Sequence, residues 1–217
     1  LSKKLDYFTN SYDLLEINFM RGNLDASVFL IEEVGIPLYS YIKTDSKSQC
    51  IISKVAARGH TCIVKYLIND ETKNIFSQEQ IKWIIIAALK YDKIDIINYL
   101  INIGFAITSD TFHYINSIKM FENVNGIFTL SLLNDHIIDK NLRVYKKLSN
   151  LNYIKYLFYN VGIKGSRNTM KYALKTNCIN IINFVHLEMK MKMVEAQCNV
   201  YYNPKVKEYI QMRSEER

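Results

Sequence analysis

The chain has 217 residues, of which 49% are hydrophobic, so it is long enough to bury a core within one or two domains. It contains only 7 Gly and 2 Pro, which argues against a loop-rich all-β fold and favours a helical one. The formal net charge of +7 favours acidic proteins, nucleic acid or anionic membrane surfaces as partners, although AT-rich coding enriches Lys whatever the function.

The cysteines and the hydropathy pattern bear on the compartment. Four widely spaced cysteines form no C-x-x-C pair, so they indicate neither a disulfide framework nor a zinc site; they are Cys50, Cys62, Cys178 and Cys198. We expect them to be buried thiols in a reducing compartment. No secretory signal is visible, and no apolar run approaches the roughly 18 residues of a membrane span. We therefore expect an intracellular protein without a membrane partner.

The first 16 residues are predicted to cap a helical stack. Their apolar side chains can cover the first helix pair; these are Leu5, Tyr7, Phe8, Tyr12, Leu14 and Leu15. From there a short helix, a break and a second apolar helix recur six times, and Leu or Val stands eight residues after each break. The predicted breaks are Gly22, Gly59, Asp92, Glu122, Ser149 and Asn177. Three units close at Gly35, Gly104 and Gly162, where a left-handed residue past a helix is expected.

The second and third units are near copies of each other. Val55–Asn69 and Ala88–Asn102 share a small residue, a break and the pattern Ile-Val/Ile-x-Tyr-Leu-Ile. One unit cannot bury its own apolar face, so neighbouring units must stack. We expect the pair Ile63 and Val64 to pack against the pair Ile96 and Ile97.

The C-terminal half matches the pattern less closely. A helix is predicted over Thr111–Phe121, and the fourth break at Glu122 is weak. Further helices are expected over Lys190–Asn199 and from Pro204, a residue that suits a helix start, to Met212. Val206, Tyr209 and Ile210 are expected to close the last apolar face. The charged stretch 213–217 is expected to be a frayed, solvated tail.

The pattern G-H-x-x-I-V-x-x-L from Gly59 to Leu67 resembles the ankyrin repeat. The mean spacing of the breaks lies close to the repeat length of that family, about 33 residues. The resemblance implies an all-α, ankyrin-like helix-pair solenoid of about six degenerate repeats with helical caps. It would form one domain over 1–217, with a cap at 1–16, repeats at 17–188, and cap helices and tail at 189–217. The T-P-L-H opening typical of the family is missing throughout.

In the ankyrin family, the last two residues of each first helix face the ligand. The corresponding pairs here are Met20 and Arg21, Ala57 and Arg58, Lys90 and Tyr91, Met120 and Phe121, Lys147 and Leu148, and Lys175 and Thr176. The resemblance therefore implies a partner-binding basic stripe with an aromatic anchor, formed by Arg21, Arg58, Lys90, Tyr91, Lys147 and Lys175. The alternative is that these are ordinary solvated helix ends, because cations complement the negative end of a helix dipole.

The histidines give no constellation for catalysis. The ankyrin resemblance assigns His60 a structural hydrogen bond, whereas His113 and His186 fall on predicted helices. His136 follows Asp135 in what is expected to be a solvated loop. No phosphate loop, nucleophile motif or metal-ligand spacing is present, and the glycines at 162 and 165 fit a repeat-ending turn. We expect no enzyme activity, no cofactor and no metal.

The resemblance implies a non-catalytic protein–protein interaction scaffold that binds an acidic protein surface. In its divergent, Asn- and Ile-rich sequence the chain resembles the ankyrin proteins of large and giant DNA viruses. This resemblance implies a host-directed adaptor or inhibitor in the host cytoplasm or nucleus. A link to ubiquitin ligation would fit that family, although no F-box-like segment is visible. The alternative is a nucleic-acid-binding helical repeat protein that uses the same stripe. No small-molecule partner is expected.

Overall fold

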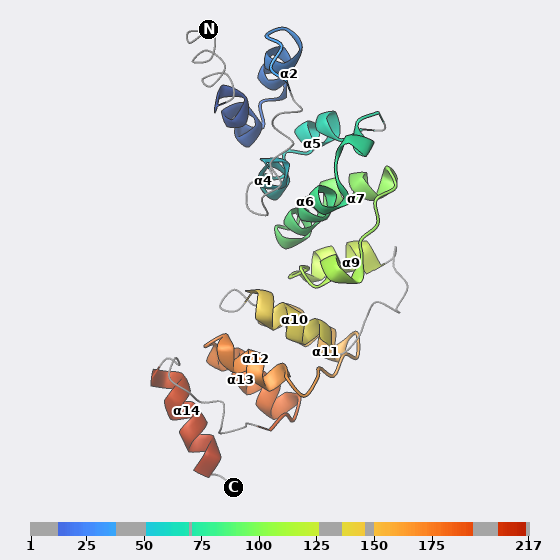
Figure 1. Ribbon diagram of the computed structural model, residues 1–217. Coiled ribbons are helices and arrows are strands. Elements are labelled where there is room, and N and C mark those ends of the chain that lie inside the picture. The colour runs from blue at the N-terminus through green and yellow to red at the C-terminus, as the bar shows by residue number, and fades with distance from the viewer. Residues whose placement is uncertain are drawn as a thin grey trace. The chain divides into compact units, whose positions relative to one another are not determined.

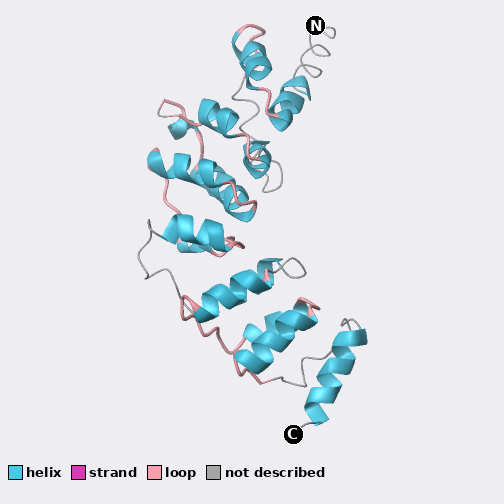
Figure 2. Cartoon of the chain, turned by 180° about the vertical axis from the view of Figure 1, so that it is seen from behind, coloured by secondary structure: helices cyan, strands magenta, loops and turns pink. Residues whose placement is uncertain are grey.

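The structure is a computed structural model that describes residues 13–37, 51–69, 71–125, 136–145, 150–192 and 204–215. Within these ranges every regular element is a helix and no strand occurs (Figure 2). The all-α prediction is therefore confirmed for the described part of the chain. None of the described helices is both long and apolar enough to cross a membrane.

The chain divides into two compact units, Leu1–Phe112 and His113–Arg217. In the first unit, residues 13–21 are helical and are followed by α2 (Leu24–Glu32), α4 (Ile51–Arg58), α5 (Thr61–Leu67), the 3-10 helix η1 (Lys73–Ile75), α6 (Gln78–Lys90), α7 (Ile94–Asn102) and α8 (Ser109–Phe112). Figure 1 shows α4 to α7 as two successive helix pairs. The first helices pack on one another, α4 on α6 and α6 on α8, while the second helix α5 packs on α7.

The core of the first unit follows from the near-copy relationship of its central segments. Ile63, Val64, Ile96 and Ile97 are all fully buried, as expected for the facing sides of α5 and α7. Ala56 on α4 and Ala88 on α6 are also fully buried, in helices that pack on each other. Burial of each large aliphatic side chain stabilises the fold by about 1.5–3 kcal/mol, so these helix contacts contribute substantially to its stability.

Four of the six predicted breaks have a left-handed backbone. Gly22 and Gly59 have φ values of 78° and 87°, and Asp92 and Asn177 have 54° and 55°. Gly adopts this conformation without steric cost, and Asn and Asp tolerate it better than other residues. The closing glycines are left-handed as well, with φ values of 75°, 99° and 81° at Gly35, Gly104 and Gly162. The fifth break, Ser149, lies outside the described residues.

The second unit contains the described helices α9 (Ile118–Asn125), α10 (His136–Tyr145), α11 (Leu151–Tyr159), α12 (Thr169–Lys175), α13 (Ile179–Asn183), the π-helix η4 (Phe184–Glu188) and α14 (Pro204–Glu215). Alternate helices again contact each other, since α10 packs on α12 and α11 packs on α9. The last helix, α14, packs on α13.

The predicted fourth break is wrong. Glu122 lies inside α9, and the continuous helix expected over 111–121 is instead interrupted between the end of α8 at Phe112 and the start of α9 at Ile118. Met120 and Phe121, predicted to face a ligand, are buried. The ring of Phe121 lies edge-on to that of Tyr156, with 5.7 Å between centroids. Its burial against this ring explains why the side chain cannot face solvent.

The two ends of the chain match the expected caps in part. Leu15 is fully buried but Leu14 is 47% exposed, and the other four N-terminal cap residues lie outside the described part. At the C-terminus α14 begins at Pro204 as predicted, and Val206 and Ile210 are buried. This helix extends to Glu215, so the expectation of a frayed tail is wrong for residues 213–215.

The thiols also differ from expectation. Cys62 is exposed on α5 and Cys178 is half-buried at the start of α13, so the prediction of buried cysteines is wrong for Cys62. Cys50 and Cys198 lie outside the described residues.

Candidate binding surface

The predicted stripe is represented in the first unit by Arg21, Arg58, Lys90 and Tyr91. The three cations end the helix of residues 13–21, α4 and α6, and all three are exposed. Tyr91 follows as the C-cap of α6 and is 52% exposed. The ends of successive first helices therefore place exposed basic side chains at equivalent positions of this unit.

Local contacts hold two of these side chains. Arg58 Nη1 lies 3.0 Å from the sulfur of Met20, and Lys90 Nζ lies 5.5 Å from the centroid of the Tyr91 ring. Among the described residues, no carboxylate lies within ion-pair distance of Arg21, Arg58 or Lys90. Their positive charges are thus not neutralised by a described carboxylate.

The remaining stripe residues belong to the second unit. Lys147 lies outside the described residues. Lys175 ends α12, is exposed, and places its Nζ 5.8 Å from the centroid of the Tyr172 ring. Whether Lys175 continues the stripe of the first unit stays a prediction.

His60 has the structural role that the sequence suggested. It is the N-cap residue of α5, and its Nε2 lies 3.1 Å from the backbone carbonyl oxygen of Met20. This hydrogen bond ties the second helix pair to the end of the helix over residues 13–21. A ring nitrogen held in this way stabilises the contact between the two helix pairs.

A small cleft lies between α10 and α12 of the second unit. Its volume is about 170 Å³, and it is lined by His136, Asp139, Lys140, Arg143, Asn168 and Tyr172. Lys140 is half-buried and Arg143 is exposed. Among the described residues, neither cation lies within ion-pair distance of a carboxylate.

The buried Asp139 is held by hydroxyl groups. The hydroxyls of Ser166 and Thr169 both donate to its carboxylate, and His136 Nδ1 lies 3.7 Å from its Oδ2. The order of groups is serine, carboxylate, imidazole, whereas a serine nucleophile needs the imidazole in the middle to accept its proton. The cluster therefore fixes the start of α12 and does not activate Ser166. His136 also begins a helix, so the loop expected around it is wrong at that residue.

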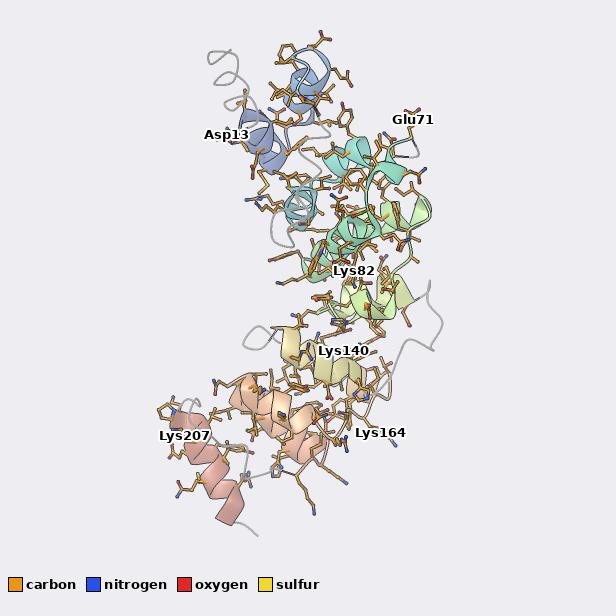
Figure 3. All side chains as sticks on the ribbon, viewed as in Figure 1. Asp13, Glu71, Lys82, Lys140, Lys164 and Lys207 are labelled. Atoms are coloured by element: carbon orange, nitrogen blue, oxygen red, sulfur yellow. The ribbon has the colours of Figure 1, made fainter. Side chains whose placement is uncertain are left out.

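Two larger clefts lie within single units. One cleft has a volume of about 680 Å³ and is bordered by the first turns of α6 and by residues 104–111. Two of its lining residues, Lys82 and Asp110, form an ion pair with 3.4 Å between Nζ and Oδ2; Lys82 is labelled in Figure 3. The other, about 410 Å³, lies beside the π-helix and is lined by Leu151, Lys155, Phe184 and Leu187 among others. Lys155 Nζ lies 5.7 Å from the Phe184 ring centroid.

Three tyrosines connect second helices through carboxylates. Tyr66 donates to Glu32 at 3.0 Å, and burial, together with this hydrogen bond, raises the pKa of its hydroxyl above 10.0. Tyr156 donates to Glu122 at 3.2 Å, and its pKa is raised for the same reasons. The hydrogen bond from Tyr159 to Glu188, 3.0 Å long, is the main cause of the raised pKa of Tyr159. Each pair favours the neutral phenol.

The sequence interpretation missed Lys140, Arg143 and Tyr172. His136, Lys140 and Arg143 are separated by four and three positions, a spacing that places them on one face of a helix. This signal was available in the sequence. The ankyrin resemblance does not mark it, because that resemblance points only to the two positions before each predicted break.

Within the described residues, no group of three or more His, Cys, Asp or Glu side chains is arranged to hold a metal ion. Comparison of the chain with protein-family models, with curated proteins and with solved structures found no match. The candidate surfaces therefore rest on the geometry of this chain alone.

Proposed function

We propose that the chain is a non-catalytic scaffold for protein–protein recognition, built as an ankyrin-like solenoid of degenerate helix pairs. This proposal is supported by the repeated local geometry of the first unit. First helices pack on first helices, α5 packs on α7, and the breaks at Gly22, Gly59 and Asp92 are all left-handed. Stacked helix pairs of this kind present extended surfaces, which such proteins use for binding.

Hydrogen bonds from tyrosines at one register position to the preceding pair support the same proposal. Tyr66 and Tyr99 stand seven residues after the breaks at Gly59 and Asp92. Tyr66 donates to Glu32 on α2, and the Tyr99 hydroxyl donates to the carbonyl oxygen of Ile68 at 2.5 Å. The acceptors differ, a side-chain carboxylate and a backbone carbonyl, but in both cases the tyrosine at this register position donates to the preceding helix pair, as stacked repeats require.

The binding surface is the set of Arg21, Arg58, Lys90 and Tyr91, and the observation that carries the proposal is their exposure at the ends of consecutive first helices. Exposed Arg and Tyr are the residue types that contribute most to interface energies. Three cations without a described carboxylate partner favour an acidic protein surface, with an association rate that falls as salt increases. The resemblance to viral ankyrin proteins makes a host protein the first candidate for this partner.

The test compares capture of proteins from a host lysate by three forms of the full chain. These are the native chain, the triple variant R58A/K90A/Y91A, and the control F29A/K192A/K207A, which removes the same charge and one exposed aromatic ring elsewhere. We expect a discrete protein to be captured by the native chain and the control and lost by the triple variant, with unchanged helicity by circular dichroism. Equal capture by all three forms would contradict the proposed surface. Loss of capture after nuclease treatment would favour the nucleic-acid alternative.

A further inference from the structure

We propose that the cleft between α10 and α12 binds an acidic side chain of a protein partner, so that the second unit carries a carboxylate-binding subsite of its own. The inference rests on the proposed function in that the partner is taken to be a protein with acidic groups. It concerns different residues, Lys140, Arg143 and Tyr172, none of which belongs to the predicted stripe.

The size of the cleft limits what it can hold. Small-molecule and cofactor sites commonly occupy about 300–1,000 Å³. The cleft has about 170 Å³, which suits one side chain rather than a whole ligand. The Tyr172 ring and the Asn168 amide line it together with the cations of α10, so an entering side chain meets an aromatic surface, amide hydrogen-bonding groups and positive charge.

The position of Asp139 leaves Arg143 available. A carboxylate four residues before an arginine on a helix is normally placed to form an ion pair with it. Here the Asp139 carboxylate is buried and accepts the hydroxyl protons of Ser166 and Thr169 at the start of α12. No ion pair joins Asp139 to Arg143. The nearest internal competitor for the guanidinium is thus engaged elsewhere.

The charges around the cleft favour an anion with planar geometry. Lys140 and Arg143 line it, and Lys175 lies close by because its Nζ is 5.8 Å from the Tyr172 ring centroid. Asp139 is the one carboxylate among the described lining residues. A guanidinium presents two parallel N–H donors that match a carboxylate, which Lys alone cannot do. The arrangement therefore fits a Glu or Asp side chain in an exposed segment of the partner.

The test uses the full chain and a fluorescein-labelled hexaglutamate peptide, with binding followed by fluorescence anisotropy. The variants are K140A/R143A and the single substitution R143A. The control is K192A/K207A, which removes the same charge as K140A/R143A at exposed positions. Lys140 on α10 and Lys207 on α14 are labelled in Figure 3. We expect K140A/R143A to weaken binding about tenfold or more and the control by less than about twofold. R143A should lose most of the affinity, and R143K should recover only part of it because the forked donor is absent.

Equal weakening by K140A/R143A and by the control would overturn the proposal, since only net charge would then matter. Displacement of the peptide by inorganic phosphate, but not by acetate at the same ionic strength, would also overturn it. Tighter binding of oligothymidylate than of the peptide, lost in K140A/R143A, would do the same. Loss of peptide binding in R58A/K90A/Y91A with retention in K140A/R143A would overturn the cleft proposal and leave the proposed function intact.

Discussion

The ring of His60 covers the α-carbon of Gly22. A β-carbon at Gly22 would come within 2.5 Å of His60 Nδ1, a distance that side-chain carbons do not reach. The same relationship recurs one pair later, where a β-carbon at Gly59 would lie 3.0 Å from Lys93 Cδ. His60 and Lys93 are the N-cap residues of α5 and α7. The break of one helix pair is therefore covered by the residue that starts the second helix of the next pair.

The first prediction compares Gly22→Ala with Gly35→Ala. Both positions are left-handed, with φ values of 78° and 75°, but a β-carbon at Gly35 meets no atom within 4 Å. Gly35→Ala should cost about 1 kcal/mol of unfolding free energy from backbone strain alone. Gly22→Ala should cost about 2–3 kcal/mol because the His60 ring must also move. Urea denaturation measures both, and equal costs would show that the ring contact is unimportant.

A second prediction concerns the coupling between the two residues. His60→Ala removes the hydrogen bond to the Met20 carbonyl and should cost about 1 kcal/mol. In that background Gly22→Ala no longer meets the ring, so its cost should fall toward that of Gly35→Ala. A double-mutant cycle by urea denaturation should therefore give a coupling energy of about 1 kcal/mol or more. Additive costs would contradict the contact.

A third prediction concerns Thr169. Its hydroxyl donates to the buried carboxylate of Asp139 and accepts the backbone N–H of Ser166 at 2.8 Å. Thr169→Val should destabilise the chain by about 2–3 kcal/mol, because a buried charge loses a donor. The matched control is Thr61→Val, whose hydroxyl makes one 3.4 Å contact with the Gly59 carbonyl and should cost no more than about 0.5 kcal/mol. Thermal or urea unfolding of both variants distinguishes them.

The fourth prediction is a loss of stability at alkaline pH. Burial and the Glu32 hydrogen bond raise the pKa of Tyr66 above 10.0, so the folded state favours the neutral phenol. This contribution is fully present below the pKa of the unfolded chain and is lost as the pH rises through the raised value. Because this hydrogen bond is exposed, Tyr66→Phe should cost only about 0.5 kcal/mol near pH 8 and less near pH 11. Tyr91→Phe is the control, because the Tyr91 hydroxyl has no hydrogen bond within the described residues. A cost of Tyr66→Phe that does not change with pH would contradict the argument.

The helix breaks show how far the sequence could predict the fold. Gly22, Gly59, Asp92 and Asn177 were recognised because the apolar pattern that follows each aligns with the Gly59 unit, and all four adopt a left-handed backbone that only a few residue types tolerate. Glu122 was misplaced because no such residue marks the actual interruption between Phe112 and Ile118. The break at Glu122 was placed only from the spacing of the apolar residues around it. Such spacing indicates a helix but does not fix the residue at which the helix begins.

Of the two candidate surfaces, the sequence could predict part of one and not the other. Exposure of Arg58, Lys90 and Tyr91 could be predicted from the resemblance to the ankyrin repeat, but the same rule is wrong for Met120, Phe121 and Thr176, which are buried. The cleft beside Arg143 could not, because it depends on the Asp139 carboxylate bonding to Ser166 and Thr169, which stand 27 and 30 residues further along the chain. Pairing over that distance leaves no local pattern in the sequence.

The hydrogen bonds between successive helix pairs of the first unit have a consequence for how it folds. They join residues 31 to 40 positions apart, as between Ile68 and Tyr99 or between Met20 and His60. Each contact therefore closes a loop of about one helix pair, and the contact order of the unit stays low. For the proposed solenoid we expect folding to nucleate on two adjacent pairs and to spread to their neighbours. Because of the buried contacts between α4 and α6 and between α5 and α7, we expect folding of the unit to start at its centre.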